Sequence, residues 1–235
     1  MGRSPRILVP GLPHHVTQRG NRGADVFTSD AERQMYAAML LKAVRRYRVH
    51  VWAYCLMTNH VHLVLVPATD EGISCVLHDV ATLYSNWFNK RNAAPGHLWQ
   101  GRFYSCVMDE PHLWAAVRYV ERNPVRAGPV ARAEEYAWSS AAAHSALRGD
   151  DLLSTDFPPP QVVRDWPAWL ADEDVAMSNA LRRATRFGRP CGSDSFVDSI
   201  GNLLDRRLLP RRGRRIRARE GRAPSFSLEV SNPPP

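Results

Sequence analysis

Residues 49–67, VHVWAYCLMTNHVHLVLVP, decide the fold class of this chain. Two runs rich in β-branched and aromatic residues, 49–57 and 60–66, flank the polar pair Thr58-Asn59. Such runs favour extended strands, and a two-residue polar connection is typical of a β-hairpin. We therefore predict an antiparallel strand pair that turns at Thr58-Asn59.

The segments around this hairpin predict two more strands and three helices. Apolar residues recur at helical spacing after residue 30, and Pro124 is expected to stop the third helix. The predicted strands are 12–20 and 103–108, and the predicted helices are 30–48, 72–89 and 110–123. The order β-α-β-β-α-β-α is that of a ferredoxin-like, split βαβ, α+β fold with one extra helix. We expect an antiparallel sheet with helices on one face, which leaves the other face free for a site.

The composition changes near residue 145, which predicts three regions. Residues 1–145 are expected to form the domain that holds the site. Residues 146–222 are expected to be a helical, arginine-rich extension with helices around 171–186 and 195–208. Residues 223–235 are expected to be a disordered tail.

The net charge of +8 is concentrated in one block. Residues 206–222, RRLLPRRGRRIRAREGR, combine nine arginines with the single acid Glu220. Such a block binds polyanions by releasing counterions condensed on phosphate, and the guanidinium fork matches phosphate oxygens. The block therefore favours nucleic acid as a partner; a solvated tail or a tail that binds an acidic protein is the alternative.

Other global features narrow the class of protein. No apolar run has the roughly 18–20 residues that a membrane-spanning helix needs. No signal-peptide pattern follows the basic N-terminus. Four widely spaced cysteines argue against a zinc site and a disulfide scaffold. We expect a cytoplasmic, nucleoid-associated protein without a membrane partner.

His60 and His62 lie two residues apart in the second strand of the hairpin, so both side chains face the same way. Val61, Leu63 and Leu65 then point into the core. Two neutral imidazoles at this spacing can chelate one divalent ion. A pair of hydrogen-bonded sheet histidines explains the pattern equally well.

The third predicted helix carries Tyr119 and Asn123, four residues apart and therefore on one helical face. The amide oxygen of Asn123 is a ligand suited to Mg²⁺ or Mn²⁺. The phenol of Tyr119 can attack phosphorus to form a covalent ester, with the metal ion as a Lewis acid. The alternatives are a packed aromatic at Tyr119 and a capping residue at Asn123.

Five stretches, taken in order, resemble the HUH superfamily of single-strand endonucleases, and more closely the REP-associated tyrosine transposases. They are HHVTQRGNRGADVF at 14–27, MTNHVHLVLVP at 57–67, HLWQGRFYSCVMDE at 97–110, RYVERNPVRAGPV at 118–130 and EYAWSS at 135–140. The later stretch GRPCGSDSFVDSIGNLLDRRL at 188–208 is similar to the C-terminal extension of many such proteins.

This resemblance implies a role for each candidate residue. The family's metal-binding pair falls on His60 and His62, and its catalytic tyrosine falls on Tyr119. The third ligand, often glutamine, falls on Asn123, whose side chain is one methylene shorter. The resemblance implies a metal-dependent transposase on the HUH endonuclease palm, with Mg²⁺ or Mn²⁺ as cofactor. Such an enzyme cleaves and rejoins single-stranded DNA at palindromic hairpins through a 5′-phosphotyrosine.

Polar residues near these groups, and in the basic block, are candidate DNA contacts. The residues predicted to bind DNA are Arg19, Asn21, Arg22, Arg102, Arg122, Arg126, Arg211, Arg212, Arg214 and Arg215. Trp99 and Phe103 fit either a stacking platform for bases or the core. His14 and His15 are expected to be structural or to contact DNA, and not to be metal ligands.

Three other functions are compatible with parts of this pattern. A non-catalytic regulator that binds hairpin DNA would keep the same fold. A rolling-circle initiator or relaxase shares the chemistry but usually comes with a helicase. A small RNA-binding module would need aromatic residues on the sheet face. The sequence leaves monomer and homodimer open, and with them the question of whether the tyrosine serves its own histidines.

Overall fold

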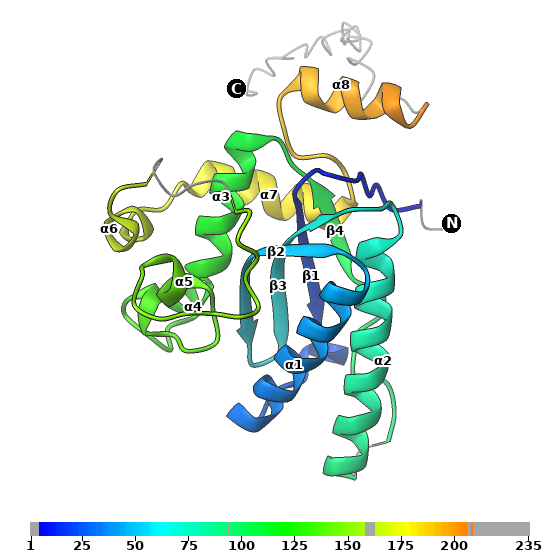
Figure 1. Cartoon of the computed structure of the whole chain (residues 1–235), viewed down its shortest axis with the longest axis vertical. Helices are drawn as coiled ribbons and strands as arrows, with labels where there is room; N and C mark the ends of the chain where they lie inside the picture. Colours follow the sequence, from blue (N-terminus) through cyan, green and yellow to red (C-terminus); the bar gives the residue numbers. More distant parts are fainter. Residues whose placement is uncertain (1–4, 94, 158–162, 206–207, 209–235) are drawn as a thin grey trace, which may run out of the picture.

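A four-stranded antiparallel sheet forms the centre of the protein (Figure 1). The structure is a computed structural model that describes residues 5–93, 95–157, 163–205 and 208. The strands are β1 (His14–Arg19), β2 (Val49–Met57), β3 (His60–Pro67) and β4 (Tyr104–Val107), and they lie in the order β2-β3-β1-β4. The predicted α+β fold and the hairpin are confirmed, because β2 pairs with β3 and the turn falls at Thr58-Asn59.

Two helices, α1 (Asp30–Arg46) and α2 (Gly72–Asn92), cover the first face of the sheet. The odd-numbered residues of β3 point toward them, as expected from the strand period. Val61, Leu63 and Leu65 are buried in one cluster with Leu40 of α1 and Leu77 of α2. This cluster is the main core.

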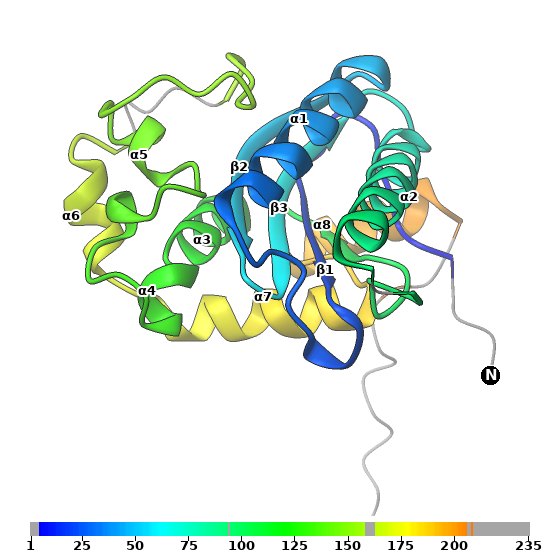
Figure 2. The same ribbon diagram turned by 90° about the horizontal axis from the view of Figure 1, so that it is seen from below.

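The second face of the sheet is also covered, so the expectation of a free face is wrong. Helices α3 (Glu110–Glu121) and α7 (Val175–Phe187) lie across it, and Figure 2 shows α7 on the side opposite α1 and α2. The reason is that β2 and β3 are apolar on both faces. Cys55 and Val64 are buried against Val117 and Leu181 of these two helices.

The third helix is shorter than predicted. It ends at Glu121, and a separate helix, α4 (Asn123–Ala127), follows after Arg122. Pro124 lies in the first turn of α4 and therefore begins a helix instead of ending one. A proline suits that turn because its missing N–H has no intrahelical partner there.

The described residues after 140 add four helices: α5 (Ala141–His144), α6 (Trp166–Ala171), α7 and α8 (Asp194–Leu203). The single helix predicted around 171–186 is interrupted at 172–174, where Asp174 caps α7 by accepting from the backbone N–H of Met177 at 2.9 Å. Arg211, Arg212, Arg214, Arg215 and the predicted tail lie outside the described residues. No helix among the described residues is long and apolar enough to cross a membrane.

Candidate active site

The two histidines of β3 and the tyrosine of α3 meet between the sheet and α7. The ring centroids of His60 and His62 are 4.9 Å apart, and those of His62 and Tyr119 are 5.4 Å apart. Tyr119 is only 8% exposed, and His62 is also buried. The structure thus brings together the histidine pair and the tyrosine that the sequence singled out.

His60 is held as a neutral ring with a defined tautomer. Its Nδ1 lies 2.7 Å from Oδ1 of Asn59, an atom that can only accept, so Nδ1 carries the proton and Nε2 keeps its lone pair. Burial, followed by the positive charge of Arg19, lowers the pKa of His60 to about 4. The side chain of Asn123 lies beside this ring and raises its pKa, against the effect of burial.

His62 is oriented by a chain of hydrogen bonds that starts on α7. The hydroxyl of Thr185 donates to the carbonyl of Leu181 at 2.8 Å, so it accepts from Nδ1 of His15 at 2.7 Å. Burial lowers the pKa of His15 to about 3, so the ring is neutral and its Nε2 must be an acceptor. Nδ1 of His62, 2.9 Å away, therefore donates to it, and Nε2 of His62 keeps its lone pair.

The donor set at this point fits a divalent ion that accepts both nitrogen and oxygen ligands. Both imidazoles are neutral and present Nε2 lone pairs, and the Asn123 side chain lies beside His60. Among the described residues, no three His, Cys, Asp or Glu side chains are grouped as a metal site. A bound ion would therefore need the amide oxygen of Asn123, and oxygens of phosphate or water, to complete its coordination.

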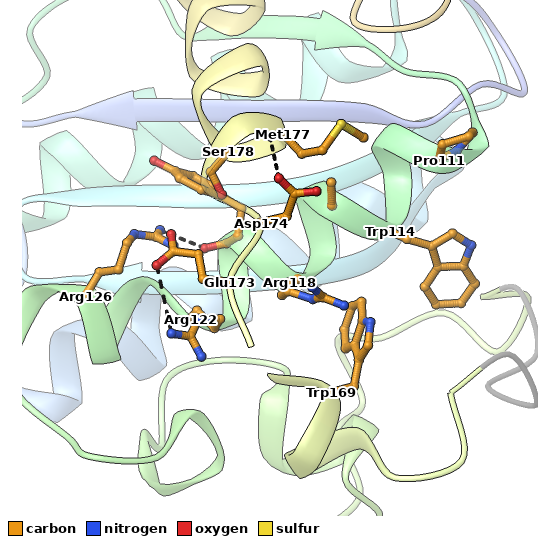
Figure 3. A pocket seen from close by; sticks show the side chains of 12 residues that line it. Pro111, Trp114, Arg118, Arg122, Arg126, Trp169, Glu173, Asp174, Met177 and Ser178 are labelled. Carbon is orange, nitrogen blue, oxygen red and sulfur yellow. Dashed lines mark hydrogen bonds and ion pairs between the residues drawn. The ribbon is translucent and has the colours of Figure 1, made fainter. Parts of the chain in front are cut away.

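Arginines surround Tyr119 on the side away from the sheet. The guanidinium carbon of Arg126 lies 4.0 Å from the ring centroid, and its Nη2 donates to the carbonyl of Tyr119 at 2.9 Å. Glu173 approaches both Arg126, at 3.5 Å, and Arg122, at 3.9 Å. Figure 3 shows these side chains lining the pocket next to α3. Two of the predicted DNA contacts thus have a carboxylate partner in this structure.

Three of the remaining candidates lie near the end of β3 that carries His60. Arg19 is directly opposite His60 in the β1–β3 register, and Asn21 and Arg22 lie in the short 3-10 helix that follows. Arg102 is exposed. Trp99 and Phe103 are buried in the main core, so they are core residues and not a stacking platform.

Sequence reasoning missed several residues that hold this site together. His15 has the structural role that the sequence predicts as one of two options, whereas no pattern in the sequence marks Thr185 or Glu173. Glu121 was also missed: its buried carboxylate accepts hydrogen bonds from Ser140, from His144 at 2.6 Å and from Trp166 at 2.7 Å. These bonds tie α3 to α5 and α6, and they involve the second serine of the stretch EYAWSS.

Comparisons with known proteins bear on the family and on the fold. Residues 9–123 match the family described as "Transposase IS200 like". No curated protein matches the chain. The chain is similar to the solved structure of a REP-associated tyrosine transposase bound to a REP hairpin, with a TM-score of 0.52 and 20% identity over 68% of this chain and 94% of that chain. A putative transposase from Deinococcus radiodurans matches with a TM-score of 0.37 and 18% identity, over 52% of this chain and 97% of that chain.

The first of these structures confirms the fold, and the family match covers the residues that form the site. His60, His62, Tyr119 and Asn123 all lie within the matched segment. Residues 9–123, which include all four of these residues, are thus assigned to the IS200-like transposase family.

Proposed function

We propose that this protein cleaves and rejoins single-stranded DNA at palindromic hairpin repeats, with Tyr119 as nucleophile and Mg²⁺ or Mn²⁺ as cofactor. The observation that carries the proposal is the convergence of Tyr119, His62 and His60 in one cluster of rings. Two neutral imidazoles and a phenol are unusual on a covered sheet face unless chemistry requires them. The family match supports transposase chemistry, and the hairpin bound by the similar solved structure supports the class of substrate.

The proposed reaction is a pair of transesterifications. The phenolic oxygen of Tyr119 attacks a DNA phosphorus, the bond from phosphorus to the 3′ oxygen breaks, and that oxygen leaves as a 3′-hydroxyl after taking up a proton. The DNA is then held as a 5′-phosphotyrosine. A 3′-hydroxyl from another strand attacks the same phosphorus and releases Tyr119 as a phenol. Each step exchanges one phosphate ester for another, so no nucleotide cofactor is consumed.

The residues of the chain have separate roles in this scheme. His60 and His62 would hold the metal ion through Nε2, with Asn123 as the oxygen ligand. When bound, the ion supplies Lewis-acid stabilisation of negative charge on the phosphate. Arg126 places positive charge against the ring of the nucleophile. Because Tyr119 lies against His62 of its own chain, the arrangement supports attack within one chain.

The proposal is tested by trapping the covalent intermediate. The protein is incubated with single-stranded DNA that carries the repeats flanking its gene, with Mn²⁺ or Mg²⁺, and the adduct is detected on a denaturing gel. We expect Tyr119→Phe and EDTA to abolish the adduct. Tyr47→Phe is the matched control, because Tyr47 directly follows α1, its hydroxyl donates to Asp79, and it lies outside the site. An adduct that persists in Tyr119→Phe would refute the assignment.

The alternative function is a non-catalytic regulator that binds hairpin DNA on the same fold. The burial of Tyr119, together with the pairing of its neighbouring arginines with Glu173, favours this alternative. A regulator would bind the hairpin equally well in EDTA and would form no adduct with any metal ion. The trapping experiment therefore separates the two functions.

A further inference from the structure

Two cysteines that are far apart in the sequence meet at the edge strand β4. The backbone N–H of Cys191, which follows α7, donates to the carbonyl of Val107 at 2.8 Å, and Cys191 forms an isolated parallel bridge with Met108. Cys106 lies two residues before Met108, so the two side chains project from the same face. Residues opposite each other in a bridge also share a face, so Cys191 projects there too.

Both thiols are buried in the core between the sheet and the helices α3 and α7. Cys106 is 1% and Cys191 is 4% exposed. The neighbouring Cys106 thiol lowers the pKa of Cys191, against the effect of burial, because it can donate to the Cys191 thiolate. Burial, followed by the Cys191 side chain, raises the pKa of Cys106. Cys191 is therefore the thiol that ionises first, and the thiolate is the nucleophilic form of cysteine.

Of the two cysteines, Cys191 lines an open pocket and Cys106 does not. The pocket has a volume of about 440 Å³ and lies at the C-terminal end of α7. Arg183 and Arg189 line it together with Cys191, and no acidic residue is among the described residues around it. Reactive cysteines occupy electropositive, partly exposed surroundings of this kind. A small dissolved oxidant therefore reaches Cys191 before Cys106.

Cys106 also contacts the hydrogen-bond chain that orients His62. Its Sγ lies 3.1 Å from Oγ1 of Thr185, the hydroxyl that accepts from His15. Because that hydroxyl donates to the carbonyl of Leu181, Cys106 is the donor in this contact. A covalent bond from Cys106 to the segment after α7 would therefore hold α7 at the point where Thr185 meets the sheet.

We infer that Cys106 and Cys191 form a reversible disulfide, made by a peroxide, that holds α7 on β4. The Cys191 thiolate attacks one oxygen of the peroxide, the O–O bond breaks, and a sulfenic acid forms on Cys191. Cys106 then attacks that sulfur, the S–O bond breaks, and water leaves with the proton of Cys106. The two thiols lose two electrons, and hydrogen peroxide is reduced to two molecules of water. A dithiol reductant reverses the reaction by thiol–disulfide exchange.

The disulfide would close the chain between residues 106 and 191 into one loop that contains α3 and Tyr119. Closing a long loop lowers the conformational entropy of the unfolded chain, so the oxidised protein should unfold at a higher temperature. Thr185 stays beside His15 in this form, so Mn²⁺ affinity should equal that of the reduced protein. The inference concerns the thiols and α7, and it holds whether or not Tyr119 cleaves DNA.

The test treats the reduced, full-length protein with hydrogen peroxide and maps the products by mass spectrometry of its peptides. We expect a Cys106–Cys191 peptide pair that has lost two hydrogens, with half of the four thiols no longer free and all four recovered with dithiothreitol. The thermal midpoint of the oxidised protein should be higher by roughly 4–16 °C, the range for one disulfide in a chain of this size.

Three variants assign the steps. In Cys106→Ser, the sulfenic acid of Cys191 should persist and react with dimedone, whereas Cys191→Ser should give neither a disulfide nor a dimedone adduct. Cys75→Ser, on α2, is the matched control and should still form the Cys106–Cys191 disulfide. Peroxide that leaves both thiols of the folded wild type free, or that joins either of them to Cys55 or Cys75, would overturn the inference. A Cys106–Cys191 disulfide that fails to raise the thermal midpoint would also overturn it, because that bond would not constrain α7.

Discussion

Thr185→Val tests whether α7 sets the metal-binding form of His62. Valine has nearly the shape of threonine but lacks the hydroxyl that accepts from His15 at 2.7 Å. Nδ1–H of His15 then has no acceptor in a buried position. The rearrangement with the lowest free-energy cost is a change of tautomer, in which Nε2 of His15 carries the proton and donates to His62. His62 must then accept at Nδ1, so its own proton moves to Nε2, the atom required for the metal.

The expected size of this effect follows from the two possible outcomes. If the tautomers stay as they are, an unsatisfied buried N–H costs about 1–3 kcal/mol of unfolding free energy. If they change, metal affinity falls, and loss of an outer hydrogen-bond partner of a ligating histidine typically weakens metal binding by about 10- to 100-fold. We expect the second effect to be the larger, because a change of tautomer satisfies the buried ring.

The assay is Mn²⁺ binding, measured by calorimetry or by the electron paramagnetic resonance signal of the free ion, with thermal unfolding as a check on folding. Thr185→Ser keeps the hydroxyl and is the matched control, so it should bind Mn²⁺ nearly as tightly as the wild type. A Thr185→Val protein that is folded and binds Mn²⁺ as tightly as Thr185→Ser would refute the hydrogen-bond argument.

Three further predictions concern acid stability and two carboxylates. His14, His15 and His60 have pKa values of about 3 to 4 in the folded protein, below the ordinary 6.5, so the unfolded chain binds more protons. The unfolding free energy should therefore be highest above pH 6.5 and fall by up to about 1.4 kcal/mol per pH unit for each histidine as the pH drops towards 4. Urea unfolding at pH 7 and pH 5 measures this, and equal stability at both would contradict it. Glu173→Gln removes the carboxylate that pairs with Arg122 and Arg126. In a plot of log DNA affinity against log salt concentration, the slope should then steepen by about one for each of these arginines that binds phosphate. An unchanged slope would show that they do not contact DNA. Glu121→Gln replaces a carboxylate that accepts three hydrogen bonds, from Ser140, His144 and Trp166, by an amide that can itself only donate at one of its two atoms. The unfolding free energy should fall by about 1–3 kcal/mol in thermal or urea melts. Wild-type stability would show that these donors do not need the carboxylate.

The parts of the fold that sequence predicts are those set by local patterns. The hairpin, the helix that carries Tyr119 and the pairing of His60 with His62 on one face all follow from periods of two or 3.6 residues. The covered second face had a local signal as well. Leu63–Val66 is a run of four apolar residues, which is typical of a strand buried on both sides.

The contacts that hold the site residues in position could not be predicted in the same way. His15 and Thr185 are 170 residues apart, and no periodicity links a histidine in a strand to a threonine in a distant helix. The same holds for Glu173, which lies in the turn between α6 and α7 and pairs with Arg122 and Arg126 about 50 residues earlier in the chain. These contacts depend on how α7 packs, which the local sequence does not encode.

The hydrogen bond between His15 and Thr185 has a consequence for the order of synthesis. The ribosome delivers both proposed metal ligands and the tyrosine long before it delivers residue 185, and N-terminal regions fold first as a chain emerges. A nascent chain that has folded its sheet still lacks the hydroxyl that orients His62. We therefore expect the competence to hold a metal ion to appear late, after α7 has docked. A chain released before residue 185 would contain both histidines and Tyr119, but the tautomer of His62 would not be fixed.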